Sequence, residues 1–194
     1  KILLTTCLKA LGYLKDEEIL SLFYKVDTVS IAKMTPSQME SVIGQRLATD
    51  ICRPDNQEDL VYRAGAKIFQ SDIENMQEMG IKSISILDMS VLKGDESIIN
   101  CLLKDDATTR EEAVSKVHNV IKPGEPSTID NAQKELQKLF FDPKKYDLGE
   151  VGRYKFNLKL YNDKEREMSS TFNKEDIIET ARYLTKVHRG IGSI

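Results

Sequence analysis

The chain has 194 residues, of which 40% are hydrophobic and 30% charged, and its formal net charge at pH 7 is −3. These proportions are typical of one or two folded domains and exclude a chain that is disordered, collagen-like or coiled-coil throughout. The three cysteines form no C-x-x-C pair, so neither a disulfide framework nor a zinc knuckle is expected. No apolar run approaches the roughly 20 residues that a membrane span needs, and we expect a soluble intracellular protein.

The N-terminal residues 1–26 show two helical patterns. Apolar residues recur at helical spacing within residues 2–12, and Asp16 is expected to cap a second helix. The composition shifts toward β-branched residues at about residue 27, where a domain boundary is predicted. The chain opens inside a helical pattern without Met and stops directly after another, so both ends are expected to be cuts inside a longer protein.

Residues 27–97 are predicted to form a small β-rich module. Three strands are expected where β-branched or alternating apolar residues stand between turn residues, at 46–52, 60–62 and 81–87. One helix is expected among them, with a Ser71–Glu74 capping box at its start and Gly80 at its end, which gives a ββαβ order. From residue 40 to 101, eleven acids oppose six bases, so phosphate binding is disfavoured and a structural or protein-facing role is expected.

The helical period returns in residues 98–194. Four further helices are expected, each opened by a residue that suits an N-cap or closed by proline or glycine. Their expected starts are Thr108 or Thr109, Ser127 or Thr128, residue 148, and Asn173. The predicted fold class is therefore α+β, a helical body interrupted by a small β-rich module.

Motifs of the common enzyme classes are absent from the sequence. It has no phosphate-binding P-loop, no dinucleotide-binding glycine motif, no nucleophile elbow and no H-E-x-x-H zinc motif. His118 and His188 lie beside apolar stripes and are expected to be helix-boundary residues and not general bases. The thiols are expected to pack as small apolar side chains; they are Cys7, Cys52 and Cys101. No catalytic residue and no metal site are predicted.

One segment, residues 144–159, is basic within an acidic chain. Five bases oppose two acids there, and three aromatic residues lie among them, namely Tyr146, Tyr154 and Phe156. Bases interleaved with aromatic rings are typical of surfaces that bind nucleic-acid backbones and exposed bases. A solvated helix face with its aromatic rings turned to the core would show the same pattern, so both interpretations stay open.

Three motifs in this region occur in a fixed order. They read VIKPGEPST at 120–128, LFFDPKKYDL at 139–148 and VGRYKFN at 151–157. Together they resemble the beta subunit of bacterial DNA-directed RNA polymerase, whose corresponding motifs are R-P-G-E-P-P-T, F-F-x-x-x-R-Y-D-L and V-G-R-x-K-x-N. The elements LKALGY at 8–13 and KEDII at 174–178 resemble the same family.

The resemblance implies a fragment that covers the lobe of that subunit, one wall of the downstream DNA channel. Residues 1–26 and 98–194 would form the lobe body, and residues 27–97 would be an insertion that differs between lineages. The catalytic residues of the family would lie outside this fragment, which is expected to be inert by itself although it belongs to a nucleotidyltransferase.

The resemblance also implies which basic residues approach the non-template DNA strand. Lys122 and Lys145 stand where some relatives have arginine; lysine keeps the point charge but lacks the planar fork of donors. Arg153 and Lys155 are further candidates for DNA binding. Arg153 has a competing interpretation, in which it braces its helix against Asp147 or Glu150.

The expected partners are DNA and the alpha, beta-prime, omega and sigma subunits, in the bacterial cytoplasm at the nucleoid. No cofactor is expected in this fragment, and the Mg²⁺ of the whole enzyme would be bound by another subunit. An alternative function is a helical protein-interaction module whose acidic insertion docks a transcription regulator.

Overall fold

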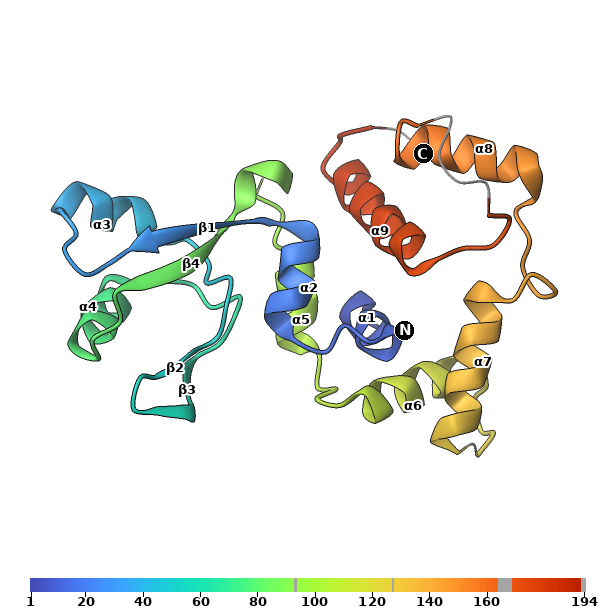
Figure 1. The fold of residues 1–194 in the computed structure, drawn as a ribbon, viewed down its shortest axis with the longest axis horizontal. Helices are drawn as coiled ribbons and strands as arrows, with labels where there is room; N and C mark the ends of the chain where they lie inside the picture. Colours follow the sequence, from blue (N-terminus) through green and yellow to red (C-terminus); the bar gives the residue numbers. More distant parts are fainter. Residues whose placement is uncertain (93, 127, 164–168, 193–194) are drawn as a thin grey trace. The chain divides into compact units, whose positions relative to one another are not determined.

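The computed structural model describes residues 1–92, 94–126, 128–163 and 169–192 (Figure 1). The chain divides into two compact units, one of residues 15–104 and one of residues 1–14 with 105–194. The first combines helices with strands and the second is helical, so the predicted α+β class is confirmed. The boundaries predicted for the insertion stay a prediction.

The unit of residues 15–104 contains all the strands that the described residues form. Its elements in chain order are α2 (Asp16–Phe23), β1 (Lys25–Ser30), α3 (Pro36–Val42), β2 (Ile51–Arg53), β3 (Asn56–Tyr62), α4 (Gln70–Glu78), β4 (Ser83–Asp88), a 3₁₀ turn (Met89–Leu92) and α5 (Ser97–Lys104). Asp16 is the first helical residue of α2 and Lys15 is the N-cap, without a side-chain capping bond, so the predicted capping role of Asp16 is wrong.

Two antiparallel strand pairs make up the sheets that the described residues form. The strands β2 and β3 form a hairpin, and β4 pairs with β1 so that Lys25 lies opposite Asp88. The ββαβ order is present in β2, β3, α4 and β4, but the last strand has its partner outside that order. The predicted strand at 46–52 is largely wrong, because only its end belongs to β2, while Arg46 and Leu47 form isolated bridges.

One core cluster of this unit is formed by residues of the β1–β4 pair, of helices α3 and α4 and of the segments between them. Its buried residues are Ile31, Val42, Leu47, Ile51, Ile68, Ile73, Met76 and Ile84. Helix α4 begins two residues earlier than predicted, with Phe69 at the N-cap position, and a carboxylate oxygen of Asp72 accepts a hydrogen bond from the backbone N–H of Phe69 at 2.9 Å. The predicted Ser71–Glu74 capping box is therefore wrong. Gly80, with a φ of +80°, follows the helix as expected.

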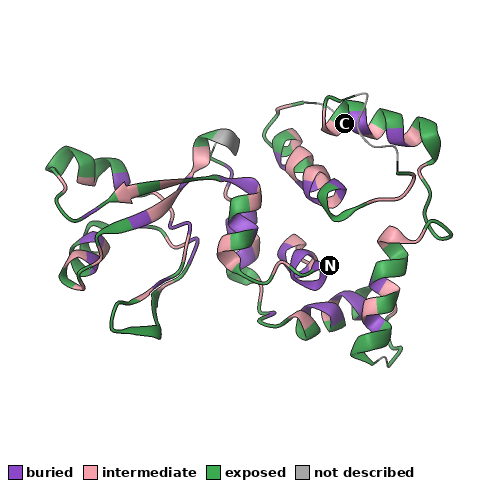
Figure 2. Cartoon of the chain, viewed as in Figure 1, coloured by how far each residue is buried: buried purple, intermediate pink, exposed green. Residues whose placement is uncertain are grey.

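The helical unit consists of α1 (Leu4–Leu11), α6 (Arg110–Ile121), α7 (Ile129–Phe141), α8 (Gly149–Leu160) and α9 (Lys174–His188). Helices α1, α6 and α7 share a core, to which α9 adds Ile177 (Figure 2). Of the two predicted capping boxes for α6, Thr109–Glu112 is the one that forms, and Asn173–Asp176 caps α9. Thr128 caps α7, whereas Ser127, its predicted alternative, lies outside the described residues.

A buried ion pair joins α1 to the segment before α6. The ammonium group of Lys9 donates to the carbonyl of Ala107 at 2.8 Å and lies 3.5 Å from Asp105 Oδ2. Thr6 Oγ1 donates to Asp105 Oδ1 at 3.0 Å. The Asp105 side chain is 0% exposed, so these contacts compensate a carboxylate that is removed from water.

Candidate nucleic-acid interface

The predicted DNA-binding residues all lie in the helical unit, on the segment from the end of α6 to the end of α8. Lys122 is the C-cap of α6, Lys145 lies in the turn after α7, and Arg153 and Lys155 belong to α8. The fold gives these four side chains different surroundings, and their availability to DNA differs accordingly.

Lys122 is a half-buried cation that already forms ion pairs with two carboxylates. Its ammonium group lies 2.6 Å from Glu135 Oε1 and 3.3 Å from Glu125 Oε2, and the side chain is 39% exposed. Hydrogen bonds to Glu135 and Glu125 raise the pKa of Lys122. The Pro123–Gly124 turn allows this geometry, since Gly124 has a φ of +83°. A phosphate at Lys122 would have to compete with both glutamates.

His118 belongs to the same cluster. It is buried, and its Nε2 lies 3.3 Å from Glu135 Oε2. The sequence offered no partner for this histidine, because Glu135 belongs to the next helix. The histidine joins α6 to α7, whereas His188 is exposed in the last turn of α9.

We expect the substitution Lys122→Met to raise the pKa of Glu135. The hydrogen bond from Lys122, and to a smaller extent the charges of Lys122 and His118, hold that pKa below its usual value. A depressed folded-state pKa means that this contact stabilises the fold above the ordinary glutamate pKa of about 4.3 and is lost as the pH falls through the depressed value. Carboxyl ¹³C NMR measures the titration, and Lys134→Met is a control on the exposed side of α7. An unchanged Glu135 titration in Lys122→Met would contradict the assignment.

Lys145 lies in a tight turn with a defined backbone. The carbonyl of Asp142 accepts hydrogen bonds from the N–H groups of Lys145 at 2.9 Å and Tyr146 at 3.0 Å, and Asp142 Oδ1 accepts one from the N–H of Lys144 at 2.9 Å. The Lys145 side chain is exposed, and no carboxylate among the described residues pairs with it. Its charge is therefore available to an anion in solution.

Arg153 is buried and engaged inside the protein. Its side chain is 3% exposed, its Nη1 lies 2.9 Å from Asp176 Oδ2, and its Nε donates to the carbonyl of Ser169 at 2.6 Å. A further hydrogen bond goes to the carbonyl of Thr171. Arg153 thus braces its helix, as the competing interpretation held, but its partner is Asp176 on α9 and not Asp147 or Glu150. In this arrangement the guanidinium group is not exposed to solvent.

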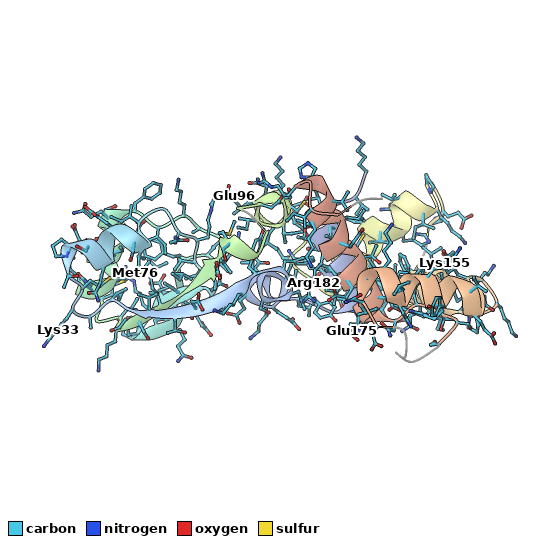
Figure 3. All side chains as sticks on the ribbon, turned by 90° about the horizontal axis from the view of Figure 1, so that it is seen from above. Lys33, Met76, Glu96, Lys155, Glu175 and Arg182 are labelled. Atoms are coloured by element: carbon cyan, nitrogen blue, oxygen red, sulfur yellow. The ribbon has the colours of Figure 1, made fainter. Side chains whose placement is uncertain are left out.

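Lys155 projects from α8 into solvent (Figure 3). Like Lys145, it has no carboxylate partner among the described residues. Of the four predicted cations, Lys145 and Lys155 are exposed and have no carboxylate partner among the described residues. Lys122 pairs with two glutamates, and Arg153 is buried.

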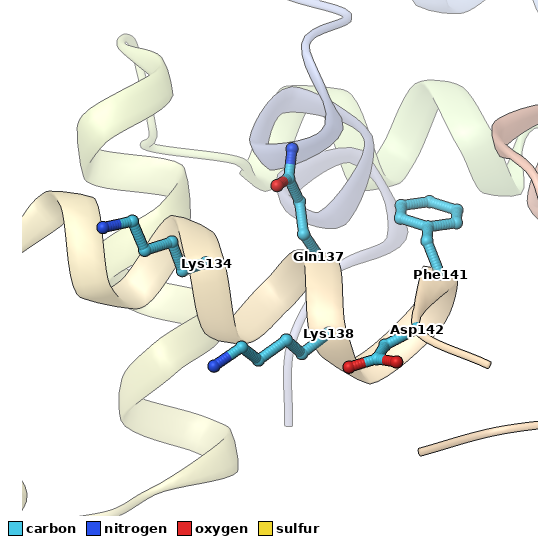
Figure 4. Close-up of a pocket in the computed structure, with 5 residues that line it drawn as sticks. All are labelled: Lys134, Gln137, Lys138, Phe141 and Asp142. Atoms are coloured by element: carbon cyan, nitrogen blue, oxygen red, sulfur yellow. The ribbon is translucent and has the colours of Figure 1, made fainter. Parts of the chain in front are cut away.

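Sequence reasoning missed two further cations, Lys134 and Lys138 on α7. They line a surface pocket together with Gln137, Phe141 and Asp142 (Figure 4). Both are exposed and lie four residues apart, which places them on one face of the helix. Two lysines four residues apart within a predicted helix would have indicated this basic helix face from the sequence.

Neither a metal site nor a membrane-spanning helix is found in the described part of the chain. Its residues contain no cluster of three or more His, Cys, Asp or Glu side chains suited to hold a metal ion. None of its helices combines the length and the apolar character needed to cross a bilayer.

Burial, and then the charge of Asp105, raises the pKa of the Cys7 thiol, which favours its neutral form.

Comparison with known proteins gives a consistent set of relatives. Residues 83–194 match the family described as RNA polymerase Rpb2, domain 2. The chain is 41% identical over 184 residues to the DNA-directed RNA polymerase subunit beta of Leptospira biflexa, which covers 93% of this chain and 15% of that protein. The subunits of that name from Treponema denticola and Borrelia hermsii are 38% and 35% identical over 100% and 98% of this chain, and it spans 18% and 17% of their lengths.

Proposed function

Because the chain belongs to the RNA polymerase Rpb2, domain 2 family, we propose that it works as part of the beta subunit of a DNA-directed RNA polymerase in transcription. The family assignment confirms the resemblance seen in the motifs. The chain spans less than a fifth of the curated relatives it matches. The polymerase activity therefore belongs to a larger assembly, with the other polymerase subunits as partners and the catalytic residues and Mg²⁺ outside this segment.

The helical unit forms a wall of the downstream DNA channel in this proposal and contacts the non-template strand. The observation that carries it is the turn after α7, where Lys144 and Lys145 are both exposed and Lys145 lacks a carboxylate partner among the described residues. Phosphates attract such a cation whatever the base sequence. Lys155 adds a second unpaired charge, Lys122 contributes less because two glutamates hold it, and Arg153 supports the fold from inside.

The substitution Lys145→Glu in the full-length subunit tests this function. In the assembled polymerase we expect a promoter open complex that dissociates about 3- to 10-fold faster, because one phosphate contact is replaced by repulsion. The slope of log stability against log salt should fall by about 1. Dissociation half-lives measured over a series of salt concentrations give both quantities.

Lys33→Glu is the matched control for that experiment. Lys33 is an exposed lysine of the other compact unit and is labelled in Figure 3. Lys33→Glu changes the net charge of the chain by the same amount as Lys145→Glu. Its effect on the half-life should be small. Equal half-lives for Lys145→Glu and the unmodified enzyme at all salt concentrations would remove Lys145 from the interface.

The alternative function, docking of a transcription regulator on the acidic module of residues 27–97, stays a prediction. The exposed surface of β3 favours it, since Leu60 and Val61 are exposed on a strand that also carries Glu58 and Asp59. A regulator with basic and apolar side chains would suit that surface. Replacing Leu60 and Val61 by Ser in the assembled polymerase should then reduce regulator response and leave basal transcription unchanged.

A further inference from the structure

Aromatic rings of the helical unit form a connected group beside the Lys145 turn. The ring of Tyr146 stacks on Phe172, with a centroid distance of 5.2 Å and an interplanar angle of 16°. Phe172 meets Phe156 edge to face at 5.3 Å and 61°. The buried guanidinium carbon of Arg153 lies 5.3 Å from the Phe156 centroid and 5.9 Å from that of Phe172. The ring of Phe172, which supports Tyr146, is therefore itself in contact with Phe156 and Arg153.

The backbone around Tyr146 is held as well. Its N–H donates to the carbonyl of Asp142 at 3.0 Å, and the N–H of Leu148 donates to the carbonyl of Ser170 at 2.9 Å. These bonds tie the turn to α7 on one side and to the segment that carries Phe172 on the other. A ring on such a backbone keeps its orientation without a ligand, so a ligand that stacks on it loses little by ordering it.

Tyr146 exposes part of its surface to a ligand. The residue is 46% exposed although Phe172 covers one face of its ring, and Phe172 is its ring partner in the described part of the chain. Tyr154 is exposed to a similar degree, but no aromatic ring of the described residues supports it. A planar ring of similar size can thus continue the stack of Phe172 and Tyr146.

The charges beside this ring indicate what kind of planar ligand fits. Lys144 and Lys145 precede Tyr146 directly, and both are exposed. A flat aromatic surface beside cations suits a nucleotide, whose base stacks while its phosphate meets a lysine. Bases inside a duplex have both faces covered by their neighbours, so a base that stacks here must be unpaired.

We propose that Tyr146 is a stacking platform for one unpaired base of the melted non-template strand. The inference rests on the proposed function, because it needs the Lys145 turn to face that strand. Any base would be accepted, since each has a π face, and stacking would contribute about 5- to 150-fold to the stability of the complex. Arg153 is a positioning residue in this arrangement, because it contacts the supporting rings and not the base.

The test combines subunit variants with a modified DNA strand. Polymerases assembled with unmodified, Tyr146→Phe or Tyr146→Ala full-length subunit form open complexes on promoters in which single non-template nucleotides are made abasic in turn. The dissociation half-life is measured for each combination. In the unmodified and Tyr146→Phe enzymes, which both carry a stacking ring, we expect one position at which loss of the base shortens the half-life at least about fivefold. The Tyr146→Ala enzyme should dissociate faster and should not respond at that position.

Each outcome decides the proposal. A Tyr146→Ala enzyme that dissociates faster but keeps the response at the abasic position overturns the platform, because the base would then be recognised without the Tyr146 ring. A Tyr146→Phe enzyme that behaves like Tyr146→Ala overturns it too, because phenylalanine keeps the stacking ring and lacks only the hydroxyl group. If Lys145→Glu reduces the salt dependence while the half-lives on the abasic promoters are the same with and without the Tyr146 ring, the proposed function is retained and the stacking platform is rejected.

Discussion

Replacing Asp176 by Ala is expected to destabilise the helical unit by about 3–5 kcal/mol, because it leaves a buried guanidinium group without its counter-charge. Asp176 Oδ2 lies 2.9 Å from Arg153 Nη1 and accepts from the N–H of Asn173 at 2.9 Å, and Asp176 Oδ1 accepts from the hydroxyl of Tyr161 at 2.8 Å. One substitution therefore removes an ion pair, part of a capping box and a contact between α8 and α9. Hydrogen exchange of the amides of α8 and α9 measures the loss.

Glu150→Ala is the control for this substitution. Glu150 is an exposed acid in the first turn of α8, three residues before Arg153 in the sequence. Its removal takes away only a favourable charge at a helix N-terminus, so the expected cost is below about 1 kcal/mol. Equal loss of protection in the two variants would contradict the assignment of Asp176 as the partner of Arg153.

The second large effect is expected at the buried pair of α1. Asp105→Ala should cost about 3–5 kcal/mol, because it removes the buried carboxylate that lies 3.5 Å from the buried ammonium group of Lys9. Thr6 would also lose the acceptor of its hydroxyl hydrogen bond. Hydrogen exchange of the amides of α1 and α6 reports this loss, since both helices pack in the core beside the pair.

The adjacent residue Asp106 offers a matched control. It pairs with Lys116, but its side chain is 86% exposed, so the pair lies in water. Asp106→Ala is expected to leave the protection of these amides nearly unchanged, because surface ion pairs are screened by solvent and contribute little. If both substitutions reduced protection equally, burial would not be what makes the Lys9–Asp105 pair important.

Local signals predicted much of the helical unit correctly. The capping boxes Thr109–Glu112 and Asn173–Asp176 join residues three positions apart, so their geometry needs only the first turn of a helix. The stop of α6 before Pro123 follows from the missing N–H of proline. Such features depend on neighbours in sequence and are visible without the fold.

Strand pairing was predicted less well, because a strand finds its partner through space. The alternation within residues 81–87 correctly indicated a strand, but β4 pairs with β1, which lies far back in the sequence. Around Arg46 the apolar pattern suggested a strand. The side chain of Arg46 instead hydrogen-bonds Glu96 at 2.9 Å and the carbonyl of Gly65 at 3.1 Å, contacts that no local pattern contains.

The candidate interface shows the same division. The sequence by itself determined that the chain resembles a polymerase beta subunit and that its positive charges concentrate in residues 144–159. Only the tertiary structure decided which of those charges are available, since Arg153 is neutralised by Asp176 of a different helix while Lys145 faces solvent. The physical reason is that a residue type specifies a charge, whereas burial and the partners brought by folding determine whether that charge can meet a phosphate.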